Sequence, residues 1–291
     1  GHINMYGNIV VGFDSSEFSK AALIESSNWV RRHGGKITLV HAVLFDEEEF
    51  VIMPEQREKR IDLGKTMCRM THESIASEFG FNGNLESLVC EGEPFDVIVD
   101  VAEGKSADLI ALGTYGRRGL RRLLMGSVTS AVIVQSPCDV LVVKRTCSEC
   151  TGRYDSLLVP FDGSELSREA LSRACDLSRS DGAEVTVVYV VPRYEEMVGF
   201  FRTAAMQKSL MREAEGVVSE ARKVASGLGV PVNTVIQEGH AATKVVEIAG
   251  TLKSDLIVMG SHGWSGIDRA VIGSTAERVI THASCPVLIA R

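Results

Sequence analysis

The chain repeats itself, and this repeat constrains the possible folds more than any other feature of the sequence. The stretch NIVVGFDSSEFSKAAL at residues 8–23 reappears as SLLVPFDGSELSREAL at 156–171. A longer stretch at 108–143, which begins DLIALG, reappears at 255–290, where it begins DLIVMG. The first pair is offset by 148 residues (156 against 8) and the second by 147 (255 against 108). Because the spacing between the two landmarks changes by only one residue, the sequence indicates duplication of a whole domain.

Each copy alternates short apolar runs with longer amphipathic stretches. In the first copy, runs of strand length lie at 9–13, 37–43, 85–90, 109–112 and 140–143. Helix-like stretches between them lie at 16–33, 55–79, 94–104 and 128–135. The second copy repeats the strand-like runs at 157–161, 185–191, 232–237, 256–259 and 287–290. Continuous apolar strands separated by helices are typical of a parallel sheet that is covered on both faces. We therefore predict two tandem α/β domains, at 5–145 and 155–291, each a doubly wound five-stranded parallel sheet with strand order 3-2-1-4-5.

Composition and charge exclude several classes of protein. The chain is 45% hydrophobic and 24% charged, which is typical of a globular protein. A net charge of −7 gives no general attraction to nucleic acids or anionic membranes. No apolar run reaches the ~18 residues of a membrane-spanning helix. We expect a cytoplasmic protein that binds neither nucleic acid nor membrane, and the seven scattered cysteines do not suggest a disulfide framework.

Polar residues follow the strands at which the predicted sheet reverses its winding direction. In open parallel sheets, ligands bind beyond the carboxyl ends of the strands at this reversal, which here lies between the first and fourth strands. The first strand ends in Phe13-Asp14 in one copy and Phe161-Asp162 in the other, and a carboxylate suits ribose hydroxyl groups. The fourth strand leads into a loop with the spacing Gly-x2-Gly-x9-Gly-Ser in both copies. These loop residues are Gly113, Gly116, Gly126 and Ser127, and Gly260, Gly263, Gly273 and Ser274.

The last Gly-Ser step of each loop opens a predicted helix. Unpaired N–H groups and the helix dipole favour an anion there, and glycines let backbone amides approach phosphate oxygens. The hydroxyl groups of Ser127, Thr129, Ser274 and Thr275 add donors. Glycines after a strand are ordinarily turn residues and a serine at a helix start is ordinarily a cap. The recurrence of the spacing in both copies, each with an aspartate at the partner strand end, favours nucleotide binding.

On these motifs, both halves resemble universal stress protein domains of the subgroup that binds ATP, a family with a Rossmann-like, adenine nucleotide alpha hydrolase-like fold. The resemblance covers nearly the whole chain. It implies that ATP, AMP or ADP, with or without Mg²⁺, binds to the first copy at Gly12, Phe13, Asp14, Ala42, Gly113, Gly116, Arg117, Gly126, Ser127, Val128 and Thr129. The matching residues of the second copy are Pro160, Phe161, Asp162, Val190, Gly260, Gly263, Gly273, Ser274 and Thr275. Asp14 would face the ribose and Thr129 the phosphates. Ala276 stands in place of Thr129, so the second copy lacks one phosphate donor.

Three functions stay open at this point. The leading hypothesis is an ATP-binding stress or signalling module that has an unknown protein partner and no efficient catalysis. The alternative is a slow ATPase or nucleotide-dependent transferase, and a third is a dimerisation scaffold with vestigial loops. We assign no catalytic residue and no metal site. The last strands resemble those that pair across dimers of single-domain members. This resemblance implies an intramolecular pseudo-dimer of the two halves, and a homodimer is a further option. Asp139 departs from the proline found at Pro286 in the second copy.

Three other signals carry less weight. Cys147 and Cys150 have the spacing of a metal-ligand pair, but no second close pair accompanies them, so a structural role is favoured over a labile disulfide or a shared metal. The arginine cluster at 117–122 is either a solvated helix face or a group that neutralises phosphate. The Gly-Lys-Ser sequence at 104–106 lacks the upstream glycine of a phosphate-binding loop.

Overall fold

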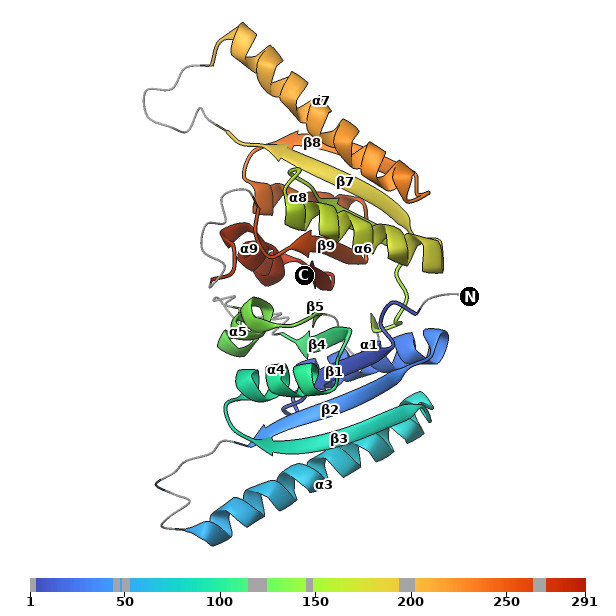
Figure 1. Ribbon diagram of the computed structural model, residues 1–291, viewed down its shortest axis with the longest axis vertical. Coiled ribbons are helices and arrows are strands. Elements are labelled where there is room, and N and C mark those ends of the chain that lie inside the picture. The colour runs from blue at the N-terminus through green and yellow to red at the C-terminus, as the bar shows by residue number, and fades with distance from the viewer. Residues whose placement is uncertain are drawn as a thin grey trace. The chain divides into compact units, whose positions relative to one another are not determined.

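The computed structural model describes residues 4–43, 48, 53–114, 125–144, 149–193, 202–263 and 271–291. The chain divides into two compact units, Gly1–Arg153 and Tyr154–Arg291. Within the described residues, each unit contains five parallel strands, in the order β3-β2-β1-β4-β5 in the first unit and β8-β7-β6-β9-β10 in the second. These arrangements confirm the predicted α/β fold and the strand order 3-2-1-4-5 in each half (Figure 1).

In the first unit, two helices cover each face of the sheet. The strands are β1 (Asn8–Gly12), β2 (Lys36–Val43), β3 (Asn84–Glu91), β4 (Leu109–Gly113) and β5 (Asp139–Val143). The helices are α1 (Glu17–His33), α3 (Pro54–Phe79), α4 (Pro94–Gly104) and α5 (Ser127–Gln135). Helices α1 and α3 pack on one face, and α4 and α5 pack together on the other. Since both faces are covered, Ile9, Val10 and Val11 of β1 are fully buried, which explains why the strands are continuous apolar runs.

The second unit has the same arrangement. Its strands are β6 (Ser156–Pro160), β7 (Glu184–Val191), β8 (Val232–Glu238), β9 (Leu256–Gly260) and β10 (Val287–Ala290). Its helices are α6 (Glu165–Asp181), α7 (Ala204–Gly227), α8 (Ala241–Thr251) and α9 (Ser274–His282). Helices α6 and α7 contact each other on one face, and α8 and α9 do so on the other.

The first helix of each unit is capped by a serine that precedes it. The Oγ atom of Ser16 accepts a hydrogen bond from the N–H of Ser19 at the start of α1. Ser164 makes the same bond with Ser167 at the start of α6. Such caps satisfy N–H groups that have no partner within the helix, so these serines fix where each helix begins.

A carboxylate at the amino end of each sheet joins β1 to β4, and β6 to β9. Asp108 Oδ2 accepts hydrogen bonds from the backbone N–H groups of Gly7 and Asn8, at 3.1 and 2.9 Å. Asp255 does the same for Asp155 and Ser156 in the second unit, at 2.7 and 3.0 Å. Because this end lies opposite the carboxyl ends of the strands, these aspartates have a structural role.

Part of the expected linker packs against the first unit. The N–H of Gly152 donates to Oε1 of the buried Glu25 on α1 at 2.9 Å. Asn28 Nδ2 donates to the carbonyl of Cys150 at 2.5 Å. Gly152 has a φ of 63°, and a Cβ there would lie 2.4 Å from the backbone nitrogen of Trp29, so only glycine fits. This segment is therefore ordered on α1, although its sequence is polar and aperiodic. Cys147 lies outside the described residues.

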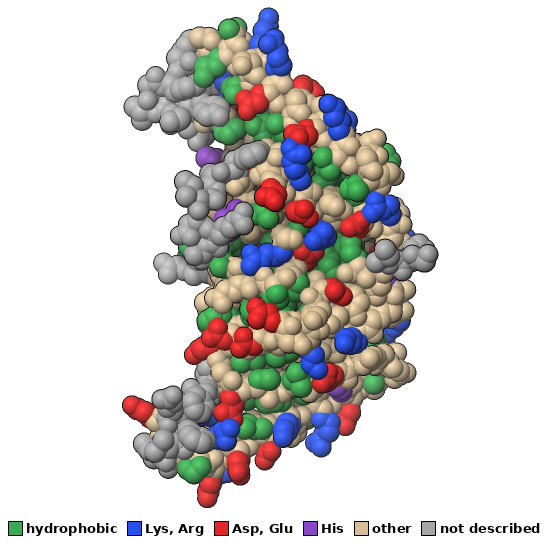
Figure 2. All heavy atoms as spheres, in the orientation of Figure 1, with side chains coloured by type: hydrophobic (Ala, Val, Ile, Leu, Met, Phe, Trp, Pro, Cys, Tyr) green, Lys and Arg blue, Asp and Glu red, His purple; other side chains and the backbone are tan. Residues whose placement is uncertain are grey.

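The surface mixes charges of both signs. On the face shown in Figure 2, acidic and basic side chains are interspersed among the described residues. No helix in the described part of the chain has the length and apolar character required to cross a bilayer.

Candidate functional site

A pocket of about 350 Å³ lies at the carboxyl ends of β1, β2 and β4 in the first unit. This is the point at which the winding direction reverses, and the volume lies within the range of about 300–1,000 Å³ that is usual for small-molecule sites. Nine of the residues predicted from the first copy line the pocket: Gly12, Phe13, Asp14, Ala42, Gly113, Gly126, Ser127, Val128 and Thr129. The other two, Gly116 and Arg117, lie outside the described residues.

One side of the pocket is a loop that follows β1, residues 13–16, which we call the acid loop. Asp14 Oδ1 accepts hydrogen bonds from the N–H of Ser16 at 3.0 Å and from Ser19 Oγ at 2.9 Å. Partial burial of the carboxyl group raises the pKa of Asp14, but the hydrogen bonds from Ser16 and Ser19 lower it by more, so the pKa lies below its ordinary value. Asp14 is therefore a carboxylate at neutral pH, held by its own loop.

The opposite side of the pocket is the start of α5. Gly126 is the N-cap residue, and no side chain of the described residues caps this helix. Its φ of −62° suits any residue, and the nearest described atom to a Cβ there would be Thr129 Oγ1 at 3.9 Å. The fold therefore does not require glycine at this position. What glycine leaves open is the space beside an uncapped helix N-terminus, where N–H groups and the helix dipole favour an anion.

Gly113 has a different explanation from Gly126. A Cβ at Gly113 would lie 2.0 Å from the carbonyl oxygen of Phe18 and 2.6 Å from the nitrogen of Ser19, both in the backbone of α1. In the second unit, a Cβ at Gly260 would lie 2.7 Å from the Cβ of Leu166 on α6. These two glycines let the first helix approach the fourth strand, so packing alone accounts for them.

Sequence reasoning missed the apolar wall and part of the polar lining. Val40, Pro94, Ile98 and Leu112 form the apolar wall together with the predicted Ala42. Phe18, Ser16, Ser19, His41 and Thr114 also line the pocket. The Nδ1 atom of His41 lies 2.9 Å from the carbonyl oxygen of Phe13, which ties β2 to the acid loop. Thr114 directly follows β4, and this position is a signal in the sequence. His41 lies within β2, and Pro94 and Ile98 belong to α4, so they carry no such signal.

The predicted residues of the second unit lie at the matching strand ends and helix start. Pro160 ends β6, Val190 lies near the end of β7 and Gly260 ends β9, while Gly273 is the N-cap residue of α9. Phe161 and Asp162 directly follow β6, Gly263 lies beyond β9, and Ser274 and Thr275 form the first turn of α9.

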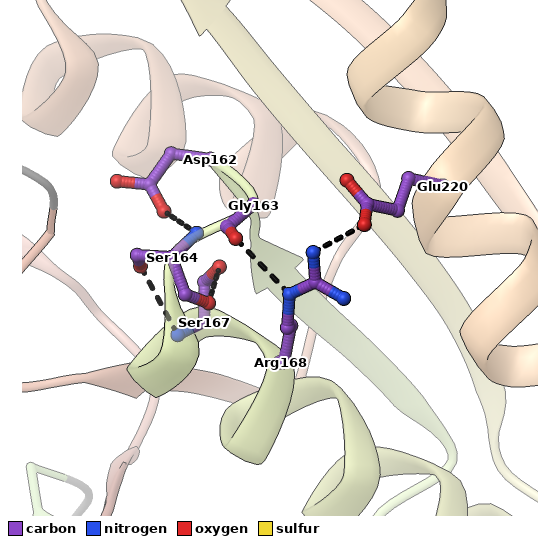
Figure 3. Close-up of polar contacts among 6 residues, drawn as sticks. All are labelled: Asp162, Gly163, Ser164, Ser167, Arg168 and Glu220. Atoms are coloured by element: carbon purple, nitrogen blue, oxygen red, sulfur yellow. Dashed lines mark hydrogen bonds and ion pairs between the residues drawn. The ribbon is translucent and has the colours of Figure 1, made fainter.

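In the acid loop of the second unit, residues 161–164, Asp162 and Gly163 both accept hydrogen bonds (Figure 3). Asp162 Oδ1 accepts a hydrogen bond from the N–H of Ser164 at 2.9 Å. Arg168 Nε donates to the carbonyl of Gly163 at 3.1 Å, and the same guanidinium pairs with Glu220 on α7. Gly263 also lies against this loop, since a Cβ there would lie 2.5 Å from Asp162 Oδ2.

The fold and the pocket together define a tandem Rossmann-like protein with a pocket at a sheet reversal point. A family model described as the universal stress protein family matches residues 5–144 and, a second time, 153–291. The chain therefore belongs to the universal stress protein family.

Individual relatives match one half or the whole chain. Universal stress protein MJ0531 of Methanocaldococcus jannaschii is 37% identical over 141 residues, which cover 47% of this chain and 82% of that protein. Universal stress protein Rv2005c of Mycobacterium tuberculosis is 26% identical over 293 residues, 97% of this chain and 96% of that one. The crystal structure of a universal stress protein from Archaeoglobus fulgidus superposes with a TM-score of 0.73 at 20% identity and covers 97% of both chains. This last likeness shows that the tandem fold is shared.

Proposed function

We propose that the first unit binds an adenine nucleotide, ATP in the first place, in the pocket between Asp14 and the start of α5. The protein would then act in a stress response by binding the nucleotide and not by turning it over. One observation carries the proposal: a single pocket has a carboxylate on one side and an uncapped helix N-terminus on the other.

The start of α5 suits the phosphates. No described side chain caps the first-turn N–H groups, and Ser127 and Thr129, which carry hydroxyl groups, line the pocket. Hydrogen bonds to charged groups are stronger than neutral ones, and a helix N-terminus adds a favourable dipole. Gly126 leaves the approach open.

The other walls suit the nucleoside. The carboxylate of Asp14 accepts hydrogen bonds, and the two hydroxyl groups of a ribose are donors that match it. The apolar wall, with Val40, Ala42 and Leu112, offers a surface for a flat aromatic base, which transfers favourably out of water.

The pocket is better suited to binding than to hydrolysis. Among the described residues that line it, Asp14 and His41 are the ionisable ones, and each is engaged within the acid loop. Phosphoryl transfer normally needs a group that orients the attacking nucleophile and a metal held near the phosphates. The described residues contain no group of three side chains that could hold a metal, so any Mg²⁺ would be bound through the phosphates of the nucleotide.

Calorimetric titration of the full chain with ATP, ADP and AMP tests the proposal. Replacing Thr129 by alanine removes one hydrogen bond to a charged group, worth about 1.5–3 kcal/mol, so the affinity for ATP should fall about 10-fold or more. Gly104→Ala is the matched control and should leave the affinity unchanged, because Gly104 is the last residue of α4 and no described atom lies within 4 Å of a Cβ there. Absence of binding at millimolar ATP would refute the proposal. The cytoplasmic location, the pseudo-dimer or homodimer and the protein partner stay predictions from the sequence.

A further inference from the structure

We infer that the two units are not equivalent: the chain holds one nucleotide, in the first unit, whereas in the second unit Gly263 lies against Asp162 and the acid loop is covered by protein atoms. This inference rests on the proposed function. It adds which of the two units binds the nucleotide and which residues determine the difference. Four comparisons of described residues support it, and Gly116, the residue that matches Gly263, lies outside the described residues.

The first difference is at the end of the first strand of each unit. A Cβ at Gly12 would lie 2.7 Å from Leu112 Cδ2 and 2.8 Å from Ile98 Cδ1, two residues that line the pocket. Glycine therefore lets the side chains of Leu112 and Ile98 pack directly against the backbone in this part of the wall. In the second unit the same strand position is Pro160, so a proline ring extends from the backbone where the first unit has only hydrogen.

The second difference is the exposure of the acid loop. In the first unit, Asp14 and Ser15 are exposed and Asp14 lines the open pocket. In the second unit, Asp162 is only partly exposed, and Gly163 and Ser164 are buried. A ligand that needs the carboxylate reaches it in the first unit, while in the second unit other protein atoms cover the loop.

The third difference is what covers and holds that loop. Gly263 lies so close to Asp162 Oδ2 that a Cβ would stand only 2.5 Å away, so this oxygen faces protein backbone where a ribose would have to enter. Arg168 joins the carbonyl of Gly163 to Glu220 on α7, as Figure 3 shows. In the first unit this position is Lys20, whose contact with Glu78 is a long one of 3.9 Å.

The fourth difference is at the helix start that would receive the phosphates. Among the described atoms, the nearest to a Cβ at Gly126 would be Thr129 Oγ1 at 3.9 Å, whereas a Cβ at Gly273 would lie 2.7 Å from the carbonyl oxygen of Ser261. The N–H of Gly273 donates to that same oxygen at 3.0 Å, so the N-cap residue of α9 is tied to the residue that follows β9. Among the described side chains, none caps the first turn of α9, as is also true of α5. The residue matching Thr129 is Ala276, which has no hydroxyl group to donate.

Two measurements on the full chain test the inference. In a calorimetric titration, we expect one ATP per chain, an affinity that falls at least 10-fold in Asp14→Asn, and less than a 2-fold change in Asp162→Asn. Both substitutions keep the size of the side chain and an oxygen that can accept the bond from the N–H two residues later, and circular dichroism confirms folding. Photolabelling with 8-azido-ATP should place the label within 5–144 and none within 153–291.

The outcomes separate this inference from the proposed function. Two ATP molecules per chain, label in both halves, or an equal loss in the two aspartate variants would overturn the inference and leave nucleotide binding standing. If the chain binds no ATP and carries no label that excess ATP displaces, both the inference and the proposed function are wrong. One ATP per chain whose label maps to the second half would overturn the assignment to the first unit.

Discussion

Replacing Gly113 and Gly126, two glycines of the same sequence motif, by alanine should have different effects: the first should lower stability and the second should lower the affinity for ATP. In Gly113→Ala, the added Cβ would lie 2.0 Å from the carbonyl oxygen of Phe18, whereas ordinary Cβ contacts are 3.4–4 Å. Helix α1 would therefore have to move by about 1.4 Å (3.4 against 2.0). Overpacking a core costs about 1–3 kcal/mol and occasionally more, and a backbone clash belongs at the upper end. For a domain of this size, about 3 kcal/mol lowers the Tm by about 6–12 °C.

Gly126→Ala meets no such obstacle, because its backbone is ordinary and the nearest described atom is 3.9 Å away. Alanine is a poorer N-cap than glycine, so we expect a loss of only about 0.5–1 kcal/mol in the free energy of unfolding. The methyl group would, however, occupy space beside the helix start, and the affinity for ATP should fall about 10-fold if one charge-assisted hydrogen bond is lost.

Thermal unfolding followed by circular dichroism, together with calorimetric titration, distinguishes the two effects. Gly113→Ala should lose stability first, and Gly126→Ala should lose affinity at nearly normal stability. Gly104→Ala is the control for adding a methyl group at an open position. If Gly113→Ala unfolds within about 1 kcal/mol of the parent, the packing explanation for that glycine is wrong. If Gly126→Ala binds ATP normally, the phosphates do not lie at the start of α5.

Three further predictions concern single contacts of the first unit and its counterpart. Ser15 has a left-handed φ of 67°, and the matching residue of the second unit is Gly163 at 81°. Since glycine adopts this conformation without strain, Ser15→Gly should raise the free energy of unfolding by about 0.5–1 kcal/mol, and Gly163→Ser should lower it, as measured by urea denaturation. Tyr6 Oη donates to the buried Asp139 Oδ2 at 2.7 Å, so Tyr6→Phe should cost about 1.5–3 kcal/mol, and a smaller Tm change than about 3 °C would contradict this. Because the folded-state pKa of Asp14 is lowered, the contribution of its carboxylate to stability should be complete above about pH 4 and should disappear as the pH falls through the folded-state pKa. If the stability difference between the parent and Asp14→Asn does not depend on pH, the assigned hydrogen bonds are wrong.

The fold was predictable because the sequence marks both the buried strands and the helix ends. The apolar run at 9–13 corresponds to β1 at Asn8–Gly12, and the amphipathic stretch at 55–79 corresponds to α3 at Pro54–Phe79. Strands covered on both faces must be apolar throughout, and Ser16 caps α1 by a purely local contact. The duplication then gave each boundary a second, independent example.

Contacts between distant segments were not predictable in the same way. Glu25 lies in an amphipathic helix, where a charged residue is ordinarily exposed, yet it is 1% exposed and binds the N–H of Gly152, 127 residues away. Neither periodicity nor local spacing reports such a partner. Gly113 illustrates a related limit, because the sequence shows a glycine but not whether a ligand or a neighbouring helix requires it.

Differences between the two copies were only partly visible in the sequence. The replacement of Thr129 by Ala276 could be read directly from the aligned repeats. The contact of Gly263 with Asp162 could not, because both residues match the first copy in type and spacing. The contact depends on where the backbone of Gly263 lies relative to Asp162, and packing in three dimensions determines this position.

A crystal structure of the full chain grown with ATP is the most direct test of the central claim. We predict electron density for the triphosphate at the start of α5, with phosphate oxygens about 2.7–3.1 Å from the backbone nitrogens near Ser127, and for the ribose beside Asp14. A nucleotide bound elsewhere on the chain, or an empty pocket at saturating ATP, would contradict the account.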